Sequence, residues 1–311
     1  MPAPAAPTKD QLLASLGGPW PDAVPLALTI ESTAQEEGYR RLQVSYAVAT
    51  GERIPAYVLI PDAVDAAHPA PGVIVWHQHN GEWDLGKSEP AGLAGNPEHH
   101  TGVELVREGY VVLCADALCF EERGDDRLEG RRYEEFEALR HLTQGTSLAW
   151  KNILDARTGV SALASLPEVD EDRLGAYGHS MGSTIGWLTG PWEPRLKVIV
   201  GNCCLPTYAA IQEHHLTHSH TNFVPGWQRY GDTPDIAALT APTPLHLNFG
   251  EDDADNPADA VRAGIDLITR AYARQGLAER FTSFVEPGVG HRLTAPMWAR
   301  ARAVLATYLR T

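Results

Sequence analysis

Cysteine, basic residues and long apolar runs are all scarce in this chain of 311 residues. Its four cysteines form no Cys-x-x-Cys pair, and the adjacent Cys203 and Cys204 have poor geometry for a disulfide or a zinc site. Cys114 lies inside an apolar segment, which indicates a small buried side chain. We therefore expect reduced thiols, as in a cytoplasmic protein. No apolar run reaches the length of about 20 residues that a membrane helix requires.

Positive charge is also in short supply, since 25 lysines and arginines face 40 aspartates and glutamates, for a formal net charge of −15. Nucleic acids and anionic membranes attract basic surfaces, so neither is an expected partner. The first residues contain no basic region followed by an apolar core, unlike a secretory signal. We expect a short frayed tail over residues 1–7 and a cytoplasmic location.

What the chain does contain is a regular succession of apolar segments. Residues 27–32 and 41–48 alternate around a turn at Gly38, which predicts an antiparallel hairpin, and residues 53–61 add another strand. Beyond residue 70, buried strands alternate with helices, which predicts an α/β fold with a mostly parallel sheet flanked by helices. The expected strands are 71–76, 110–114, 173–177, 196–200, 244–249 and 281–285, and the expected helices include 100–108, 147–166, 259–273 and 297–309.

We expect a lead-in over residues 1–25 and a single domain over residues 26–311. Residues 203–243 break the alternation, since they contain several prolines and a group of histidines. Ligands of such sheets bind beyond the carboxyl ends of the strands, so we expect this insertion to lie like a lid over the site. The charged segment 121–140 is expected to be partly helical and solvated.

The most informative stretch is Gly178-His179-Ser180-Met181-Gly182, a Gly-x-Ser-x-Gly motif between an apolar strand and a helix. In that context the serine lies on a sharp, strained turn and its hydroxyl is exposed over the edge of the sheet. The flanking glycines leave room for the close approach of strand and helix. Ser180 is therefore the candidate nucleophile.

A serine nucleophile needs a base and a third group that orients the base. His291 follows the last expected strand in a Gly-rich loop, and it is the candidate base. The loop after the preceding strand carries several carboxylates, of which Asp253 is preferred because it lies just past the turn at Gly250. Asp252 and Asp255 remain alternatives. The acid would orient the imidazole and stabilise its protonated form.

Negative charge that develops on an attacked carbonyl oxygen needs hydrogen-bond donors. One expected donor is the backbone N–H of Met181, which follows the nucleophile at the start of a helix. The second is expected from the loop after strand 71–76, where His79 or Gln78 would supply an N–H.

Further side chains are expected to line the pocket. His214 and His218 would share one face of a helix at i, i+4 spacing, as metal ligands can. No glutamate lies between them in the zinc-protease position, and serine chemistry needs no metal, so we expect neither a metal nor a cofactor. The pocket candidates are His77, Trp83, His179, His214, His218 and Trp227.

The order Ser180, Asp253, His291 on alternating strands and helices resembles the α/β-hydrolase superfamily. Within it, the chain is similar to the dienelactone hydrolase and acetyl xylan esterase-like branch over roughly residues 70–310. Dienelactone hydrolases proper use a cysteine nucleophile, where this chain has Ser180. The matching pieces are 71–77, 178–182, 230–244, 250–257 and 287–291.

The resemblance implies an α/β-hydrolase fold and a serine hydrolase that cleaves small-molecule carboxylic esters through an acyl-enzyme. Two alternatives remain, namely amide or peptide cleavage by the same residues and a non-catalytic binding protein of this fold. The sequence does not specify the acyl and alcohol groups, and it leaves open whether the chain forms a homo-oligomer.

Overall fold

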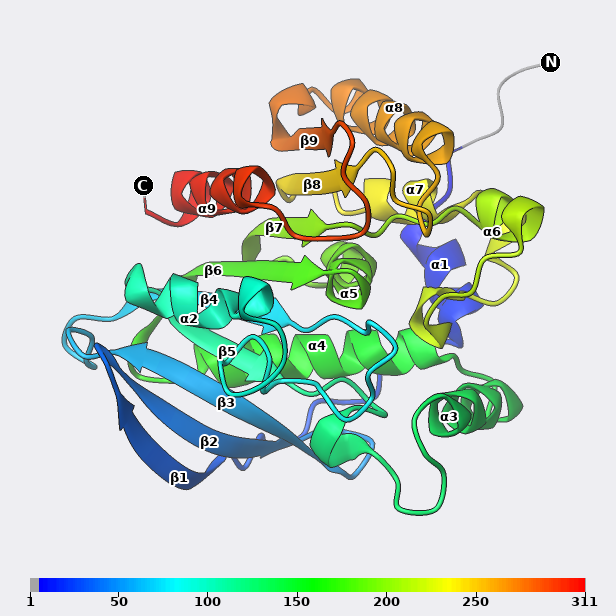
Figure 1. Ribbon diagram of the computed structural model, residues 1–311. Coiled ribbons are helices and arrows are strands. Elements are labelled where there is room, and N and C mark those ends of the chain that lie inside the picture. The colour runs from blue at the N-terminus through cyan, green and yellow to red at the C-terminus, as the bar shows by residue number, and fades with distance from the viewer. Residues whose placement is uncertain (1–5, 311) are drawn as a thin grey trace.

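The computed structural model describes residues 6–310, so the first part of the expected tail lies outside the described residues (Figure 1). Within this range, nine strands form one sheet in the order β1-β2-β3-β5-β4-β6-β7-β8-β9. The pairs β1–β2, β2–β3 and β3–β5 are antiparallel, and all the other pairs are parallel. The strands are β1 (Thr29–Glu36), β2 (Tyr39–Ala47), β3 (Arg53–Pro61), β4 (Ala70–Trp76), β5 (Val111–Ala115), β6 (Val169–His179), β7 (Leu196–Asn202), β8 (Leu245–Gly250) and β9 (Phe281–Glu286).

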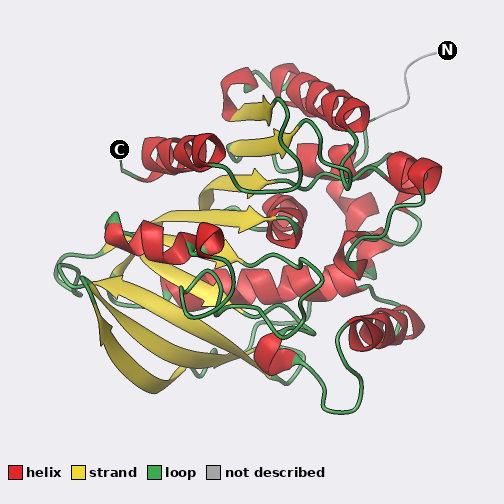
Figure 2. Cartoon of the chain, viewed as in Figure 1, coloured by secondary structure: helices red, strands yellow, loops and turns green. Residues whose placement is uncertain are grey.

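Helices cover both faces of the parallel part of the sheet (Figure 2). β4 is buried along its whole length, as expected for a parallel strand covered on both sides. Its Val73 and Val75 belong to the core shared with α2 (Thr101–Arg107) and α9 (Ala295–Leu309), whereas Ile74 belongs to the core shared with α4 (Leu148–Ala164) and α5 (Met181–Thr189). The helices are α1 (Lys9–Leu16), α2 (Thr101–Arg107), α3 (Arg131–Thr143), α4 (Leu148–Ala164), α5 (Met181–Thr189), α6 (Tyr208–His214), α7 (Thr233–Ala238), α8 (Ala258–Arg274) and α9 (Ala295–Leu309).

The predicted α/β fold is therefore confirmed, including the antiparallel strands at the N-terminal side of the sheet. No helix among residues 6–310 combines the length and apolarity needed to cross a bilayer. All four cysteines are buried free thiols.

The lead-in contains a helix that the sequence analysis did not predict. Thr8 and Gln11 form a capping box at the start of α1, in which each side chain pairs with the other residue's backbone N–H. Leu12 and Leu16 are fully buried in the main core. Trp20 stacks on Trp150 at 5.7 Å between ring centroids, so the segment after α1 is also packed.

The expectation that segment 121–140 is solvated was wrong for several of its charged residues. α3 begins at Arg131, but Arg123, Glu134 and Glu137 are buried. Each of the three has polar partners: Arg123 binds Asp155 at 2.9 Å, Glu137 pairs with Arg140, and Glu134 accepts several hydrogen bonds described below. Burial of a charge is tolerated when such partners replace water.

Candidate active site

The turn between β6 and α5 gives Ser180 a positive φ, which side chains rarely adopt, with φ 54° and ψ −119°. Only glycine fits two residues before it and two residues after it. A Cβ on Gly178 would lie 2.2 Å from the carbonyl carbon of Gly182, and a Cβ on Gly182 would lie 2.1 Å from the carbonyl oxygen of Trp76. The motif thus lets α5 start directly against β4 and β6, which exposes the Ser180 hydroxyl beyond the sheet.

His291, in the loop after β9, joins this serine to Asp253. Its Nε2 lies 2.8 Å from the Ser180 hydroxyl oxygen, and its Nδ1 lies 2.8 Å from Oδ2 of Asp253. Because a carboxylate only accepts, Nδ1 carries the proton in this pair and Nε2 is free to accept from the serine hydroxyl. The three residues therefore form a continuous hydrogen-bonded array.

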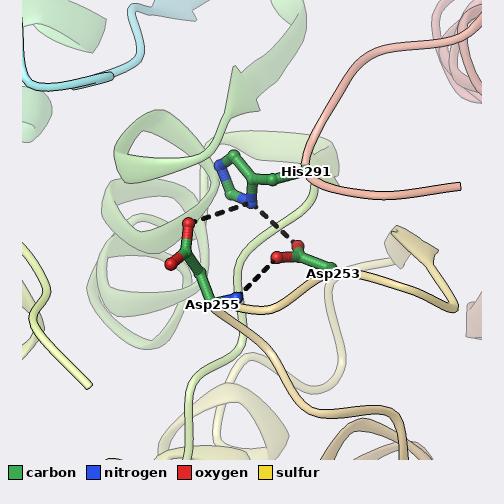
Figure 3. Close-up of side chains that lie close together, drawn as sticks. All are labelled: Asp253, Asp255 and His291. Atoms are coloured by element: carbon green, nitrogen blue, oxygen red, sulfur yellow. Dashed lines mark hydrogen bonds and ion pairs between the residues drawn. The ribbon is translucent and has the colours of Figure 1, made fainter. Parts of the chain in front are cut away.

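The structure distinguishes the three candidate acids, Asp252, Asp253 and Asp255, and Figure 3 shows how Asp253 and Asp255 lie relative to His291. The side chain of Asp253 is fully buried and also accepts from the N–H of Asp255 at 2.9 Å and from the amide of Asn256 at 3.0 Å. Asp255 is 56% exposed, and its carboxylate lies 4.0 Å from Nδ1 of His291. Asp252 is exposed, and its N–H binds the carbonyl of Val289. Only Asp253 has a short hydrogen bond to the imidazole.

This environment raises the pKa of His291. Burial alone would lower the pKa, but the hydrogen bond and the charge of Asp253, together with the charge of Asp255, outweigh it. The protonated imidazole is therefore stabilised, which is what a base needs at the moment when it has taken a proton.

The residues expected to supply hydrogen-bond donors are Met181, His79 and Gln78, and they differ in position. Met181 is the first residue of α5, so its N–H has no partner within the helix. His79 and Met181 both line the cavity that contains Ser180 and His291. Gln78 is buried beside that cavity rather than in its wall, and its amide donates to Glu89 at 2.9 Å. Of the two residues proposed for the second donor, His79 therefore lines the cavity and Gln78 does not.

The cavity at Ser180, called here the Ser180 cavity, has a volume of about 380 Å³. Of the pocket residues expected from the sequence, Trp83 and His218 line it. The insertion supplies one wall, and the loop after β4 supplies another. The lining residues are His79, Asn80, Gly81, Trp83, Arg131, Glu134, Ser180, Met181, Cys204, Thr217, His218, Ser219, His220, Asn222, Asp255 and His291.

Four expected pocket residues lie elsewhere. His77 is buried beneath the loop, where its Nδ1 donates to the carbonyl of Gln78 and its Nε2 accepts from the N–H of Ala117. His179 lines a separate small cavity and accepts from the amide of Asn202 at 2.8 Å.

The other two lie in the insertion. His214 is exposed at the end of α6, and His215 has left-handed backbone geometry, so His214 and His218 do not share a helix face. Trp227 is fully buried, donates to the carbonyl of Asp232 and lines a separate cavity.

Glu134 of α3 is a site residue that the sequence analysis missed. Its buried carboxylate accepts from His79 Nε2 and Trp83 Nε1, each at 3.1 Å, and from Ser219 Oγ at 2.8 Å and the His220 N–H at 2.7 Å. Burial would raise its pKa, but the side chains of His220, His79 and Ser219 hold the pKa well below its usual range. Glu134 therefore joins the loop after β4 to the insertion. Its place in a run of charged residues gave no sign of this.

Among residues 6–310, two groups of side chains have ligand atoms close enough to hold a cation. In one of them, Asp116, Glu121 and Glu122 surround the ammonium group of buried Lys87 at 2.6–2.8 Å, so a cation of the protein itself fills that place. The other group is Asp253, Asp255 and His291, where the Nδ1 proton of His291 already occupies the space between the side chains.

Comparison with known proteins agrees with this fold. The chain matches the Dienelactone hydrolase family over residues 54–297. It is 30% identical over 265 residues to the Bacillus subtilis (strain 168) protein YtaP, which is named as a hydrolase, and the match covers 83% of this chain and 84% of YtaP.

Two solved structures show the same fold. The acetyl xylan esterase from Paenibacillus sp. R4 superposes with a TM-score of 0.66 at 16% identity, covering 92% of this chain and 90% of that one. The glucuronoyl esterase from Solibacter usitatus superposes with a TM-score of 0.69 at 15% identity, covering 96% and 91%. The sheet order, the matched residues and the relationship to YtaP lead to one conclusion: this chain belongs to the dienelactone hydrolase family and has the α/β-hydrolase fold.

Proposed function

We infer that this protein hydrolyses carboxylic esters through an acyl-enzyme intermediate on Ser180. The observation that carries the proposal is the pair of 2.8 Å hydrogen bonds that links Ser180, His291 and Asp253 at the edge of an open cavity. The two similar structures described above are named as esterases, which favours an ester over an amide as the substrate class.

In the first half of the reaction, Ser180 Oγ attacks the ester carbonyl while its proton passes to Nε2 of His291. The buried carboxylate of Asp253 keeps Nδ1 protonated and stabilises the imidazolium that forms. The carbonyl oxygen, now negatively charged, accepts from the N–H groups of Met181 and His79, a type of contact whose loss costs about 3 kcal/mol of transition-state stabilisation. His291 then protonates the departing alcohol.

In the second half, water takes the place of the alcohol. His291 removes a proton from that water as it attacks the acyl carbonyl, and the imidazolium returns the proton to Ser180 Oγ. The carboxylic acid leaves and the hydrogen-bonded array is restored. No step requires a metal or a cofactor.

Two measurements test the proposal. The wild type should hydrolyse p-nitrophenyl acetate and should be labelled by a fluorophosphonate, which reacts with activated serines. Ser180→Ala should lose both, whereas Ser183→Ala should keep both, because Ser183 is buried in the first turn of α5 and does not line the Ser180 cavity. A wild type that is neither labelled nor active would support the alternative of a non-catalytic binding protein.

A further inference from the structure

A second cavity of about 550 Å³ lies beside the Ser180 cavity and differs from it in chemistry. Mostly apolar side chains line it, whereas polar groups dominate around Ser180. Its volume is within the range of about 300–1,000 Å³ that is usual for small-molecule sites. This apolar cavity is lined by Ala138, Leu142, Ser147, Leu148, Tyr208, Ile211, Gln212, His220, Phe223, Val224, Pro225, Gly226, Trp227 and Gln228.

The two cavities are neighbours along one face of α3. Arg131 and Glu134 line the Ser180 cavity, and Ala138 and Leu142, one and two turns further on, line the apolar cavity. His220 borders both. A single helix face thus changes from charged to apolar as it leads away from Ser180.

The apolar cavity also leaves hydrophobic surface in contact with solvent. Leu142 is 50% exposed and Phe223 is 39% exposed, although Phe223 stacks on Tyr208 at 6.2 Å between ring centroids. Covering such surface with an apolar group is favourable in proportion to the area removed from water.

We propose that the apolar cavity binds an apolar group of the same ester whose carbonyl reacts at Ser180. The proposal rests on the proposed function and specifies the substrate class: an ester with a polar reacting end and an alkyl or aryl arm long enough to pass His220. Glu134 holds the backbone N–H of His220, and so it fixes the wall that the arm must pass. The arm belongs either to the acyl group or to the alcohol.

The test compares two series of substrates, p-nitrophenyl esters with acyl chains from acetyl to decanoyl, and acetate esters of alcohols from ethanol to decanol. In one series, kcat/KM should rise about two- to fourfold per methylene once the chain passes His220, because each buried methylene adds to binding. The series that shows the rise identifies the side of the ester that carries the arm.

Variants on α3 locate the effect. Leu142→Glu should lower kcat/KM for the long-chain ester about tenfold and leave that for the acetyl ester unchanged. Leu139→Glu is the matched control, since Leu139 is exposed on the same helix and does not line the apolar cavity. Phe223→Ser, in the part of the lining that the insertion supplies, should repeat the pattern of Leu142→Glu. Both Leu142 and Phe223 are partly exposed, so the variants should fold.

The outcomes separate this inference from the proposed function. If the wild type cleaves acetate esters and kcat/KM does not rise with chain length in either series, the inference alone is overturned. The same holds if Leu142→Glu and Leu139→Glu lower kcat/KM for the long-chain ester equally. A wild type that forms a dimer which Leu142→Glu dissociates would assign the apolar cavity to a second copy of the chain and also overturn it. Failure to cleave any ester overturns both proposals.

Discussion

The substitution Glu134→Gln isolates the contribution of one buried carboxylate to the architecture of the site. Each carboxylate oxygen accepts from two donors: Oε2 from His79 and Trp83, and Oε1 from Ser219 and the His220 N–H. The Nδ1 atom of His79 accepts from the N–H of Gly81, which places the imidazole proton on Nε2. His79 therefore cannot become an acceptor toward residue 134 without losing that bond.

A glutamine has one accepting oxygen and one donating NH₂. Either the donors His79 and Trp83 or the donors Ser219 and His220 must therefore face the NH₂ in place of an acceptor. The less costly orientation turns the NH₂ toward Ser219 and His220, because the Ser219 hydroxyl can rotate to accept. The His220 N–H then loses its partner, at a cost of about 1–3 kcal/mol. The remaining bonds lose a charged acceptor, which adds about 1 kcal/mol. We expect a loss of about 2–4 kcal/mol in the free energy of unfolding.

Urea unfolding followed by tryptophan fluorescence measures this loss, and steady-state hydrolysis of p-nitrophenyl acetate measures its effect on the site. His79 keeps its partner in the favoured orientation, so kcat should change little, while KM should rise severalfold as the wall at residues 219–220 shifts. The control is Glu135→Gln, since the Arg131–Glu135 pair is exposed and such pairs contribute less than about 1 kcal/mol. Equal stability and kinetics in the two variants would refute the role given to Glu134.

Three further predictions follow from the site. In ester hydrolysis, Asp253→Asn should lower kcat about 10⁴-fold, whereas Asp255→Asn should lower it less than about tenfold. A larger loss in Asp255→Asn than in Asp253→Asn would make Asp255 the acid. The pKa of His291 is raised despite burial, mainly by Asp253. We therefore expect kcat/KM to rise with pH through a midpoint above about 6.5, and this midpoint should fall in Asp253→Asn. An unchanged midpoint in that variant would contradict the pairing of His291 with Asp253. The same raised pKa means that the pair stabilises the fold most at low pH, and this stabilisation is lost as pH rises through that pKa. Gly182→Ala should destabilise the fold by more than about 3 kcal/mol, measured by urea unfolding. In the control Gly81→Ala, the added Cβ has no atom within 4 Å, so the variant should cost only the backbone strain of about 1–2 kcal/mol. Similar losses in the two variants would refute the steric argument.

Local patterns were enough to predict most of the framework. The run of residues 71–76 is buried on both faces, and its sequence already indicated a parallel strand because it contains no polar alternation. The turn at Ser180 was equally readable, since a glycine on each side of a serine between strand and helix is a steric requirement of the backbone. α1 could also have been predicted, because the capping box of Thr8 and Gln11 is a local signal.

Features that depend on contacts between distant segments were not predictable. The position just past Gly250 favoured Asp253 but left Asp252 and Asp255 open, because the hydrogen bond that distinguishes Asp253 comes from His291 in the loop after β9. Glu134 looked like one charge among many until its donors arrived from residues 79 and 220. The expected pocket roles of His214 and Trp227 depended on the path of the insertion, which periodicity does not encode.

The most direct test of the central claim is to trap the acyl-enzyme. The protein is mixed with p-nitrophenyl acetate, quenched in acid within the first turnover and digested for peptide mass spectrometry. We predict an acetyl group on Ser180 in the wild type and none at that position in Ser180→Ala or His291→Ala. An acetyl group on another residue during turnover, or turnover that continues undiminished in Ser180→Ala, would contradict the account.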